Sequence, residues 1–515
     1  MVMGLLSPRG SQITTTPVAE SCPSYLKGVS KDILKKCDGL PLAINAISSL
    51  LATRKTKEEW DEVRCSIDFA RGTNPDIDAL NYILSLSYFD LPHRLRSCLL
   101  YMTLFPEDYK IDRLRLVHRW ISEGFVHSKD GKDLVELGDA YFHELVNRSL
   151  IQPIDIGYDG KAWGCRVHDT ILDFLIYKST QENFCTLLGD RSEATNFSDN
   201  EVRRLSQLGN VGRSHKMDLS HARTFGTFVH TKQMLSLESN ALRVLDLEDC
   251  CGLENHHIKS IGRFPQLRYL NISSTRITKL PEQIGDLRHL ETLNAYCDLL
   301  RELSETVTRL QRLVRLSIRW RTKLPDSIGN MTNLQELQYI DVFKHSLCFV
   351  DLRKLRIKLD TDGIEGEKLA SYKEKLESSL RKLDARKCPS LWIAVCLSEK
   401  DGVEGYPFFP ALSCIRKISL VCRERCRIAK CLIQLVSLEK LYVYAKEIEK
   451  QDLEIVGRIP NLLEVDIYNG KTGHRHHQRR ISTAAVFSVH CNTCKGLMFE
   501  AGTMPKLPCL TRTRV

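Results

Sequence analysis

The residues Gly470-Lys471-Thr472 are of the types that close a phosphate-binding loop. Such a loop has the pattern Gly-x-x-x-x-Gly-Lys-Ser/Thr, because several backbone amides and one lysine must converge on the phosphates. Val465 stands where the first glycine must be, so we interpret the match as chance. No hydrophobic run ending in paired aspartates, which would hold magnesium, precedes residue 40. The sequence therefore predicts no catalytic nucleotide site, and we expect that the chain is not an enzyme.

Two further motifs have residue types that bind zinc. His143-Glu144 begins the pattern of a zinc protease, but Asn147 occupies the place of the second histidine. Cys491 and Cys494 have the spacing of half a zinc site, and no second pair lies at finger spacing. We therefore expect no metal site.

Size and composition restrict the class of protein. A chain of 515 residues should hold two to four domains. No apolar run reaches the roughly 18 residues that span a bilayer, and the N-terminus lacks the apolar region of a secretory signal. The 19 cysteines are scattered, often within apolar segments, as free thiols would be. We expect an intracellular protein with no membrane span.

The net charge of +10 is spread along the chain, and its densest cluster lies at residues 474–480. We interpret this cluster as a solvated loop, with an acidic partner or nucleic acid as the alternatives.

The elements that would position these residues begin with two helices within residues 29–51. Gly39 suits a left-handed helix end and Pro41 suits the first turn of the next helix, so Gly39, Leu40, Pro41 and Leu42 form a corner. Before it, residues 10–16 have the β-branched content of a buried strand.

Apolar spacing next predicts helices over residues 79–88, 94–105, 114–124 and 134–149, and then a hairpin over 151–167 that turns at 158–160. This order describes a winged helix. Its third helix carries Arg113, Arg115 and Arg119 but also acidic residues, so we do not expect it to bind nucleic acid.

The run Cys165-Arg-Val-His-Asp169 leads into another helix, for which Asp169 is the expected N-cap. His168 therefore lies where compact helices give way to leucine-spaced segments. On the residues alone, it is a structural histidine that packs this hinge.

Leucine-spaced segments recur every 21 to 25 residues from Leu242 to Leu337, within the range of leucine-rich repeats. Further copies begin at residues 352, 415, 438 and 462, whereas residues 340–410 keep the period poorly and the tail from 473 holds only one partial copy. We expect the residues between the leucines to face outward on a concave surface; these are Arg243, Val244, Arg268, Tyr269, Val314, Arg315, Arg353, Lys354, Arg416 and Lys417. A basic strip with an aromatic suits a protein partner with acidic patches. An ordinary solvated surface is the alternative.

Several runs resemble a known family. Residues 30–43, containing Gly-Leu-Pro-Leu, and Lys57-Glu-Glu-Trp60 are similar to the first helical subdomain of the nucleotide-binding module in plant disease-resistance proteins of the nucleotide-binding, leucine-rich-repeat (NB-LRR) class, coiled-coil type. Residues 86–92, 105–109 and 120–125 are similar to the winged-helix subdomain of these receptors. Val167-His168-Asp169 matches their Met-His-Asp signature, with valine for methionine.

The resemblance implies a multidomain α plus α/β fold. Residues 1–20 would be a remnant of the nucleotide-binding core, with Pro17 in place of the arginine of its sensor strand. Residues 21–75 would be the first helical subdomain, 76–190 the winged helix and 200–515 a leucine-rich-repeat solenoid.

The resemblance also implies ADP or ATP as a cofactor. Pro41, in the corner of Gly39, Leu40 and Leu42, would contact the adenine, and His168 would donate to the β-phosphate of ADP. A charge-assisted hydrogen bond contributes about 1.5–3 kcal/mol and, when it forms in one state alone, biases a two-state equilibrium. Because the phosphate loop and most of the family's nucleotide-binding core are missing, we expect weak ADP binding or none.

We therefore expect an intracellular plant immune receptor, cytoplasmic or shared with the nucleus. Its partners would be a pathogen effector or a guarded host protein on the concave repeat surface, and a nucleotide-binding domain in the same chain or in trans. The first alternative is a scaffold, decoy or regulator that acts through its repeats without a nucleotide. The second is a degenerate product in which residues 1–75 have no stable fold.

Overall fold

A computed structural model describes most of the chain from Pro23 to Cys491. The described ranges are 23–37, 40–73, 79–128, 131–156, 161–189, 202–209, 219–229, 239–319, 321–341, 352–360, 390–397, 413–422, 425–426, 430–445, 447–448, 450–469 and 486–491, with isolated positions between 371 and 381. The chain divides into two compact units. The first comprises Met1–Ile156 and Ala162–Phe228, and the second comprises Gly157–Lys161 and Val229–Val515.

The first unit opens with the helices of the predicted corner. A short 3-10 helix, η2 (Ser24–Leu26), precedes α1 (Lys27–Lys36), α2 (Pro41–Leu51) and α3 (Lys57–Thr73). Pro41 occupies the first turn of α2, as predicted, and Leu40 before it is extended. The predicted strand over residues 10–16 and Gly39 lie outside the described residues.

A winged helix follows, which confirms the predicted class of domain. Its helices are α4 (Ala79–Phe89), α5 (His93–Leu100), α6 (Arg113–Glu123), α7 (Leu134–Asn147) and α8 (Asp169–Gln181). Strands β2 (Gln152–Ile156) and β3 (Ala162–Arg166) pair antiparallel, and β1 (Ile111–Asp112) adds a third strand in the order β1-β3-β2. The helix predicted over 94–105 changes at Tyr101 into a 3-10 turn, η3 (Tyr101–Leu104), a common way for a helix to end.

Local signals in the sequence fix the bounds of α6. Asp112 caps its start, because the Asp112 carboxylate accepts from the backbone amide of Arg115 at 2.8 Å. Gly124 ends it with φ at 89°, a left-handed conformation that favours glycine.

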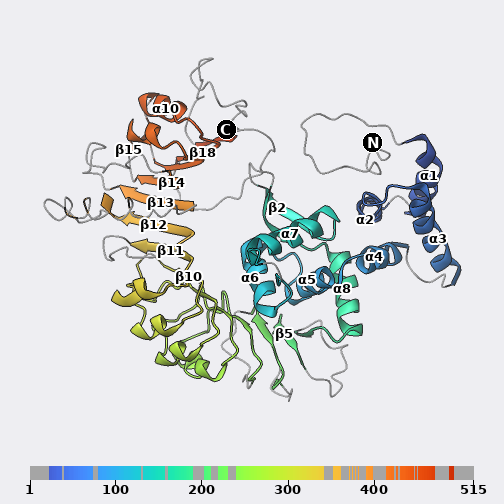
Figure 1. Cartoon of the computed structure of the whole chain (residues 1–515), viewed down its shortest axis with the longest axis horizontal. Helices are drawn as coiled ribbons and strands as arrows, with labels where there is room; N and C mark the ends of the chain where they lie inside the picture. Colours follow the sequence, from blue (N-terminus) through green and yellow to red (C-terminus); the bar gives the residue numbers. More distant parts are fainter. Residues whose placement is uncertain are drawn as a thin grey trace. The chain divides into compact units, whose positions relative to one another are not determined.

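One continuous apolar core joins all these helices. Trp60 of α3, Tyr88 of α4, Trp120 of α6, Phe142 of α7 and Leu175 of α8 are fully buried members of it. Helix α4 packs against both α2 and α8. The corner helices and the winged helix therefore share α4 as a common neighbour (Figure 1).

Parallel strands of the repeat type begin within the first unit. Strands β4 (Thr186–Leu188), β5 (Arg204–Gln207) and β6 (Thr224–Thr227) pair in that order. These strands precede the first leucine-spaced segment that the sequence shows clearly.

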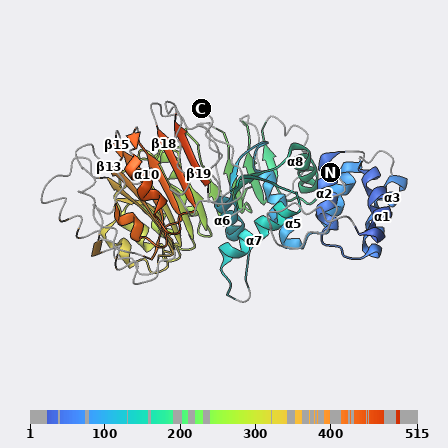
Figure 2. The same cartoon turned by 90° about the horizontal axis from the view of Figure 1, so that it is seen from above.

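The second unit is a ladder of parallel strands that lie side by side in chain order (Figures 1 and 2). They are β7 (Val244–Asp246), β8 (Tyr269–Asn271), β9 (Thr292–Ala295), β10 (Arg315–Ile318), β11 (Glu336–Asp341), β12 (Lys354–Asp360), β13 (Ser390–Leu397), β14 (Ile415–Cys422), β16 (Lys440–Tyr444), β18 (Glu464–Asn469) and β19 (Val486–Cys491). Each predicted repeat from Leu242 to the copy that begins at residue 462 supplies a strand, and the partial copy in the tail lies outside the described residues. Leu242, Leu245 and Leu247 are buried, as are Leu267, Leu270 and Ile272 of the next repeat.

Short helices form the opposite side of this ladder. They are η4 (Asn255–Ile258), η5 (Ile261–Arg263), η6 (Glu282–Asp286), η7 (Glu305–Arg309), η8 (Asp326–Asn330), η10 (Lys430–Gln434) and α10 (Lys450–Gly457), and a small parallel pair, β15 (Arg425–Cys426) with β17 (Glu447–Ile448), lies beside the ladder. No helix in the described part of the chain has the length and apolar character needed to cross a bilayer.

Gly164 on β3 provides a test of the winged-helix sheet. A methyl group at this position would lie 2.5 Å from the backbone oxygen of Ile111, which cannot rotate away. We expect Gly164→Ala to lower the free energy of unfolding of the first unit by about 1–3 kcal/mol.

Gly28 on α1 is the matched control, because nothing lies within 4 Å of an added methyl group there. Gly28→Ala should raise stability by up to about 1 kcal/mol through helix propensity. Urea denaturation followed by tryptophan fluorescence measures both variants, and equal midpoints for the two would contradict the register of β1 and β3.

Candidate functional site

The structure corrects the predicted start of α8, which carries the family signature. His168, rather than Asp169, is the N-cap: its backbone is extended, and its ring nitrogen Nδ1 accepts from the backbone amide of Thr170 at 3.3 Å. Asp169 is the first helical residue, where its negative charge favours the helix dipole. Aspartate is the commoner N-cap, but a histidine ring nitrogen can accept the same bond.

This hydrogen bond determines which nitrogen of His168 can act as a donor. A ring whose Nδ1 accepts carries the proton of its neutral form on Nε2. The side chain is half-buried, and Val167 before it is buried in the core. His168 therefore caps α8 at the hinge, as a structural histidine would. Its expected donation to ADP stays a prediction.

The second predicted site is the corner before α2. Leu40 is 41% exposed, Pro41 is exposed and Leu42 is half-buried. The backbone amide of Ile44 donates to the carbonyl of Leu40 at 3.0 Å, so the first turn of α2 fixes the corner. An exposed leucine and proline on a fixed turn offer an apolar surface to a flat ring.

The structure relates the corner and His168 through α4. Helix α2 begins at Pro41 and α8 begins after His168, and both helices pack on α4. Among the described residues, no hydrogen bond or ion pair joins Leu40, Pro41 or Leu42 to His168. The two parts of the predicted site therefore lie on helices that share α4 as a neighbour, with no direct polar contact between them among the described residues.

A buried ion pair that the sequence did not suggest lies between α6 and β5. The guanidinium of Arg204 donates through Nε and Nη2 to Oε2 of Glu123, at 3.1 and 3.0 Å. Its third nitrogen, Nη1, donates to the carbonyl of Phe184 at 3.3 Å, and the ring of Phe184 lies 4.2 Å from the guanidinium carbon. The Glu123 side chain is fully buried and that of Arg204 is 9% exposed. We call this pair the Glu123–Arg204 clamp.

Neighbouring contacts strengthen the clamp. Thr224 on β6 donates its hydroxyl to the second oxygen of Glu123. Ser206 on β5 donates to the carbonyl of Leu104 at 2.6 Å. Phe228, just after β6, packs on the rings of Phe105 and Tyr109. The first repeat strands are therefore bonded directly to the winged helix.

The arginines of α6 are engaged within the winged helix. Arg119 is fully buried, with its guanidinium 4.6 Å from the ring of Phe105 and its Nε donating to the hydroxyl of Tyr101 at 3.0 Å. Burial raises the pKa of the Tyr101 hydroxyl, with Arg119 opposing that effect. Arg113 pairs with Asp139 and Arg115 donates to Tyr109.

The predicted outward row of the repeats is partly wrong. The register places Val244, Tyr269, Thr292 and Arg315 side by side on neighbouring strands. Val244, Tyr269 and Thr292 are buried, whereas Arg315 is half-buried. Neighbouring strands lie less than about 5 Å apart, so the large ring of Tyr269 covers Val244 and Thr292 on either side of it.

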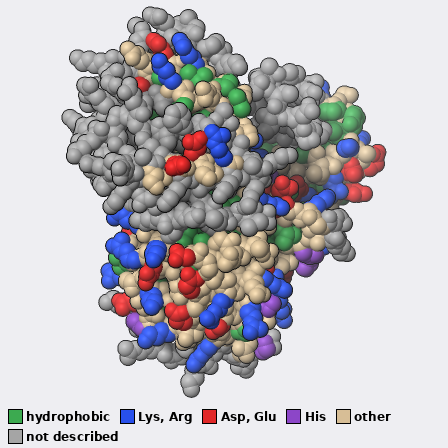
Figure 3. Space-filling model, turned by 60° about the vertical axis from the view of Figure 1, so that its left-hand side comes forward, with side chains coloured by type: hydrophobic (Ala, Val, Ile, Leu, Met, Phe, Trp, Pro, Cys, Tyr) green, Lys and Arg blue, Asp and Glu red, His purple; other side chains and the backbone are tan. Residues whose placement is uncertain are grey.

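Three arginines of the predicted basic strip are paired with acidic residues of the next repeat: Arg268 with Glu291 at 4.0 Å, Arg315 with Glu336 at 3.7 Å, and Arg416 with Glu439. Lys440, which the prediction did not include, pairs with Glu464 at 3.0 Å. Burial raises the pKa of Glu291, and Arg268 opposes that rise. In the described part of the face seen in Figure 3, basic and acidic side chains are interspersed. The surface therefore offers alternating charge and not a single positive field.

An aromatic site lies further along the same sheet. The ammonium of Lys417 on β14 lies 3.7 Å from the ring centre of Trp392 on β13 and 4.3 Å from that of Tyr442 on β16. The Trp392 indole donates to Ser419 at 3.0 Å. Three neighbouring strands thus present a cation between two rings.

Comparison with known proteins gives two family matches. Residues 104–175 match the disease-resistance protein winged-helix domain, and residues 221–514 match a leucine-rich-repeat region. The second match spans more than half of the chain. The chain belongs to the plant disease-resistance (NLR) family.

Its relatives include rice and Arabidopsis members of the same family. The rice (Oryza sativa subsp. japonica) disease-resistance protein Pik-2 is 37% identical over 56% of this chain and 29% of its own length. Rice disease-resistance protein RGA5 is 31% identical over 95% of this chain and 45% of its own. Disease-resistance RPP13-like protein 4 of Arabidopsis thaliana is 30% identical over 71% of this chain and 46% of its own. The chain thus spans less than half the length of each of these relatives.

For this NLR family member, sequence reasoning missed the clamp for a definable reason. Glu123 and Arg204 are 81 residues apart, and no short motif joins them. Glu123 itself gave no local signal, because it ends a helix that already carries three arginines and a histidine. Of the two zinc motifs considered in the sequence, Cys494 lies outside the described residues. Among the described residues, no three His, Cys, Asp or Glu side chains lie close enough together to hold a metal ion.

The clamp can be tested by removing one partner. Arg204→Met removes the two charge-assisted hydrogen bonds that Arg204 donates to the buried carboxylate of Glu123. We therefore expect the free energy of unfolding of the first unit to fall by about 3–5 kcal/mol. Adding Glu123→Gln removes the buried negative charge as well, so the double variant should be more stable than Arg204→Met alone.

The exposed pair of Glu377 and Arg381 is the control. Arg381→Met should change stability by no more than about 0.5 kcal/mol. Urea denaturation measures all variants, and a loss for Arg204→Met as small as that for Arg381→Met would show that the clamp contributes nothing.

Proposed function

We propose that this chain acts as an immune receptor of the plant cytoplasm, or of cytoplasm and nucleus, in which the repeats recognise a pathogen effector or a guarded host protein. The winged helix would convert that recognition into a change of conformational state. The Glu123–Arg204 clamp is the observation that carries this proposal. It ties the first repeat strands to α6 through a fully buried charge, so a force on these strands acts directly on the winged helix.

The repeat sheet supports the recognition step. Alternating charges on neighbouring strands would select a partner by the order of its charges, because a mismatch places like charges together. Lys417 between Trp392 and Tyr442 adds a cation and two rings to this surface. A protein with acidic groups near exposed apolar side chains fits both features.

The state of the winged helix would depend on ADP. Two features support the proposal: Nε2 of His168 is the nitrogen left to donate to a phosphate, and Leu40 and Pro41 offer an apolar surface for the adenine. These few contacts amount to about 3–6 kcal/mol before the cost of association, which corresponds to millimolar affinity at best for this chain alone. Calorimetry that found micromolar ADP binding would contradict this estimate.

The test at His168 separates its two roles. His168→Ala removes the cap of α8 and should lower stability by about 0.5–2 kcal/mol, whereas His168→Asn keeps a good capping residue and removes the imidazole. If His168 regulates the receptor, both variants should alter the immune response in leaf tissue, and His168→Asn should do so at wild-type stability.

The second candidate function is a scaffold, decoy or regulator that uses only the repeats. The aromatic site around Lys417 favours it, because this site lies on the strand ladder and needs no nucleotide. For such a protein, His168→Asn should leave the response unchanged, while Trp392→Ala should abolish it. The same pair of variants in leaf tissue therefore decides between the two candidates.

A further inference from the structure

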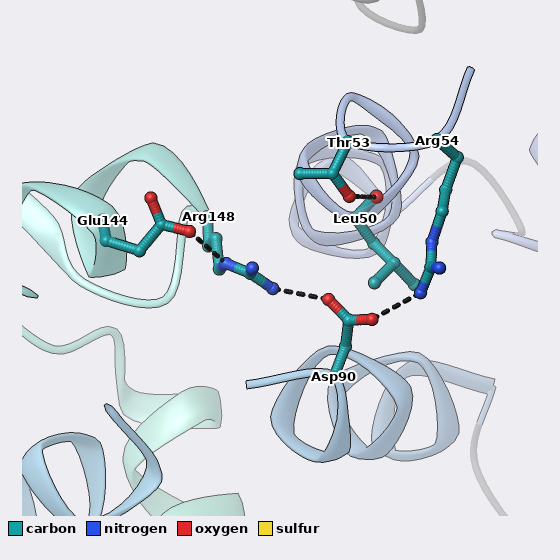
Figure 4. Close-up of polar contacts among 6 residues, drawn as sticks. All are labelled: Leu50, Thr53, Arg54, Asp90, Glu144 and Arg148. Atoms are coloured by element: carbon teal, nitrogen blue, oxygen red, sulfur yellow. Dashed lines mark hydrogen bonds and ion pairs between the residues drawn. The ribbon is translucent and has the colours of Figure 1, made fainter. Parts of the chain in front are cut away.

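The C-terminal ends of three helices meet at one aspartate in the first unit (Figure 4). Helices α2, α4 and α7 end at Leu51, Phe89 and Asn147, and each is followed within three residues by a charged side chain: Arg54, Asp90 and Arg148. A helix C-terminus carries about half a negative charge, so the two arginines are favourable there and Asp90 is not. Asp90 is therefore tolerable only with its cations in place.

Asp90 accepts from both arginines, one from each side. Arg54, which follows α2, donates to Oδ1, and Nη1 of Arg148 donates to Oδ2 at 2.7 Å. Nε of Arg148 also donates to Glu144 at 2.7 Å. Burial alone would lower the pKa of Arg148, but its bonds to Glu144 and Asp90 outweigh that effect and raise it. One carboxylate thus links the corner helices to the end of α7.

The backbone of Arg54 is held from two sides. Its amide donates to the carbonyl of Leu51 in α2 at 3.0 Å, and its carbonyl accepts from the indole of Trp60 in α3 at 3.2 Å. Trp60 is fully buried. Arg54 therefore moves with α2 and α3 as one body.

Ser149 makes a second link across the same junction. It ends α7 in a left-handed conformation, with φ at 57°, and its amide donates to Val146 at 2.9 Å. Glycine is the usual residue there, because a side chain in this conformation costs about 1 kcal/mol. The Ser149 hydroxyl lies 2.9 Å from that of Ser49 in α2. The strained position therefore carries a side chain that reaches the other subdomain.

This junction is weaker by construction than the Glu123–Arg204 clamp. All three guanidinium nitrogens of Arg204 have acceptors, whereas Nε of Arg54 is buried with no acceptor among the described residues. The side chains of Arg54 and Asp90 are 34% and 21% exposed, so water and salt can reach them. The contacts hold the two subdomains together but can be broken without exposing a fully buried charge.

We propose that Arg54, Asp90, Arg148, Ser49 and Ser149 form a releasable latch that fixes the first helical subdomain against the winged helix in the resting state. We call it the Asp90 latch. That the latch acts in a resting state rests on the proposed function as an immune receptor. That its contacts hold α2 against the end of α7 does not depend on that function. When it opens, the apolar contact between α2 and α4 remains as the pivot, while the end of α7 separates from α2.

The experiment is hydrogen exchange measured by mass spectrometry on the full chain. In Asp90→Ala, two cations are left beside each other, so exchange at residues 48–54 and 146–151 should rise about tenfold or more, the factor expected for losing a charge-assisted bond. Exchange in α6 and β3 should stay as in the wild type. Asp61→Ala, which removes an exposed ion pair to Arg64 within α3, is the control and should change nothing at these two segments.

Two outcomes would overturn the latch. Unchanged exchange at both segments would show that the ion pairs hold nothing. A rise across the whole first unit would show that Asp90 is only a structural residue of the core.

Ser149→Gly keeps the proposal testable if Asp90→Ala does not fold. Glycine relieves the left-handed strain, so exchange at residues 146–151 should slow, while loss of the Ser49 contact should speed exchange at residues 48–54. A merely structural role would move both segments in the same direction, and that result would also overturn the latch.

Salt and a tissue assay complete the test. Raising sodium chloride from 0.05 to about 0.5 M should speed exchange at residues 48–54 in the wild type but leave α6 unchanged, because the clamp is buried.

In leaf tissue, Asp90→Ala should raise the immune response in the absence of a pathogen. Faster exchange without a tissue response would keep the latch and reject the receptor function, so the two failures are distinguishable.

Discussion

The buried carboxylate of Glu123 is the constraint on which the first unit depends. A charge without exposure to water must be paired, and Glu123 takes its partners from β5 and β6. This requirement fixes where the first repeat strands lie on α6, because a shift of these strands would break the two bonds from Arg204 to Oε2 of the buried carboxylate. The arrangement explains why the compact unit continues to Phe228, beyond the last helix of the winged-helix domain.

The Glu123–Arg204 clamp and the Asp90 latch differ in strength, and a switch needs one firm junction and one that can open. The clamp is fully buried and all its nitrogens are bonded, so it makes the winged helix and the first repeat strands one body. The Asp90 latch is partly exposed and leaves Nε of Arg54 without an acceptor among the described residues. Motion should therefore begin at α2 and α7 and not at α6 and β5, since the weaker of two junctions in series opens first.

The sequence predicted those features that depend on neighbouring residues. Local residues predicted that α2 begins at Pro41 and that α6 ends at Gly124. Spacing within single elements likewise predicted the helices of the winged helix and the repeat strands. The N-cap of α8 was misassigned by one residue, because histidine and aspartate can both accept the capping bond and only the backbone angles decide. The clamp and the latch could not be predicted, since they join residues 36 to 100 positions apart for which no local pattern exists.

The repeat surface shows a further limit and what it means for recognition. Spacing identified which residues stand between the leucines, but not that Tyr269 would be buried or that Glu291 and Glu336 would face the arginines. Those pairings arise from register between strands more than twenty residues apart. Because Arg268, Arg315 and Arg416 already have acidic neighbours, a partner gains little from net charge there and must compete with these internal ion pairs. Specificity then rests on whether the partner's own charges match the alternating order, which a partner of uniform charge cannot do.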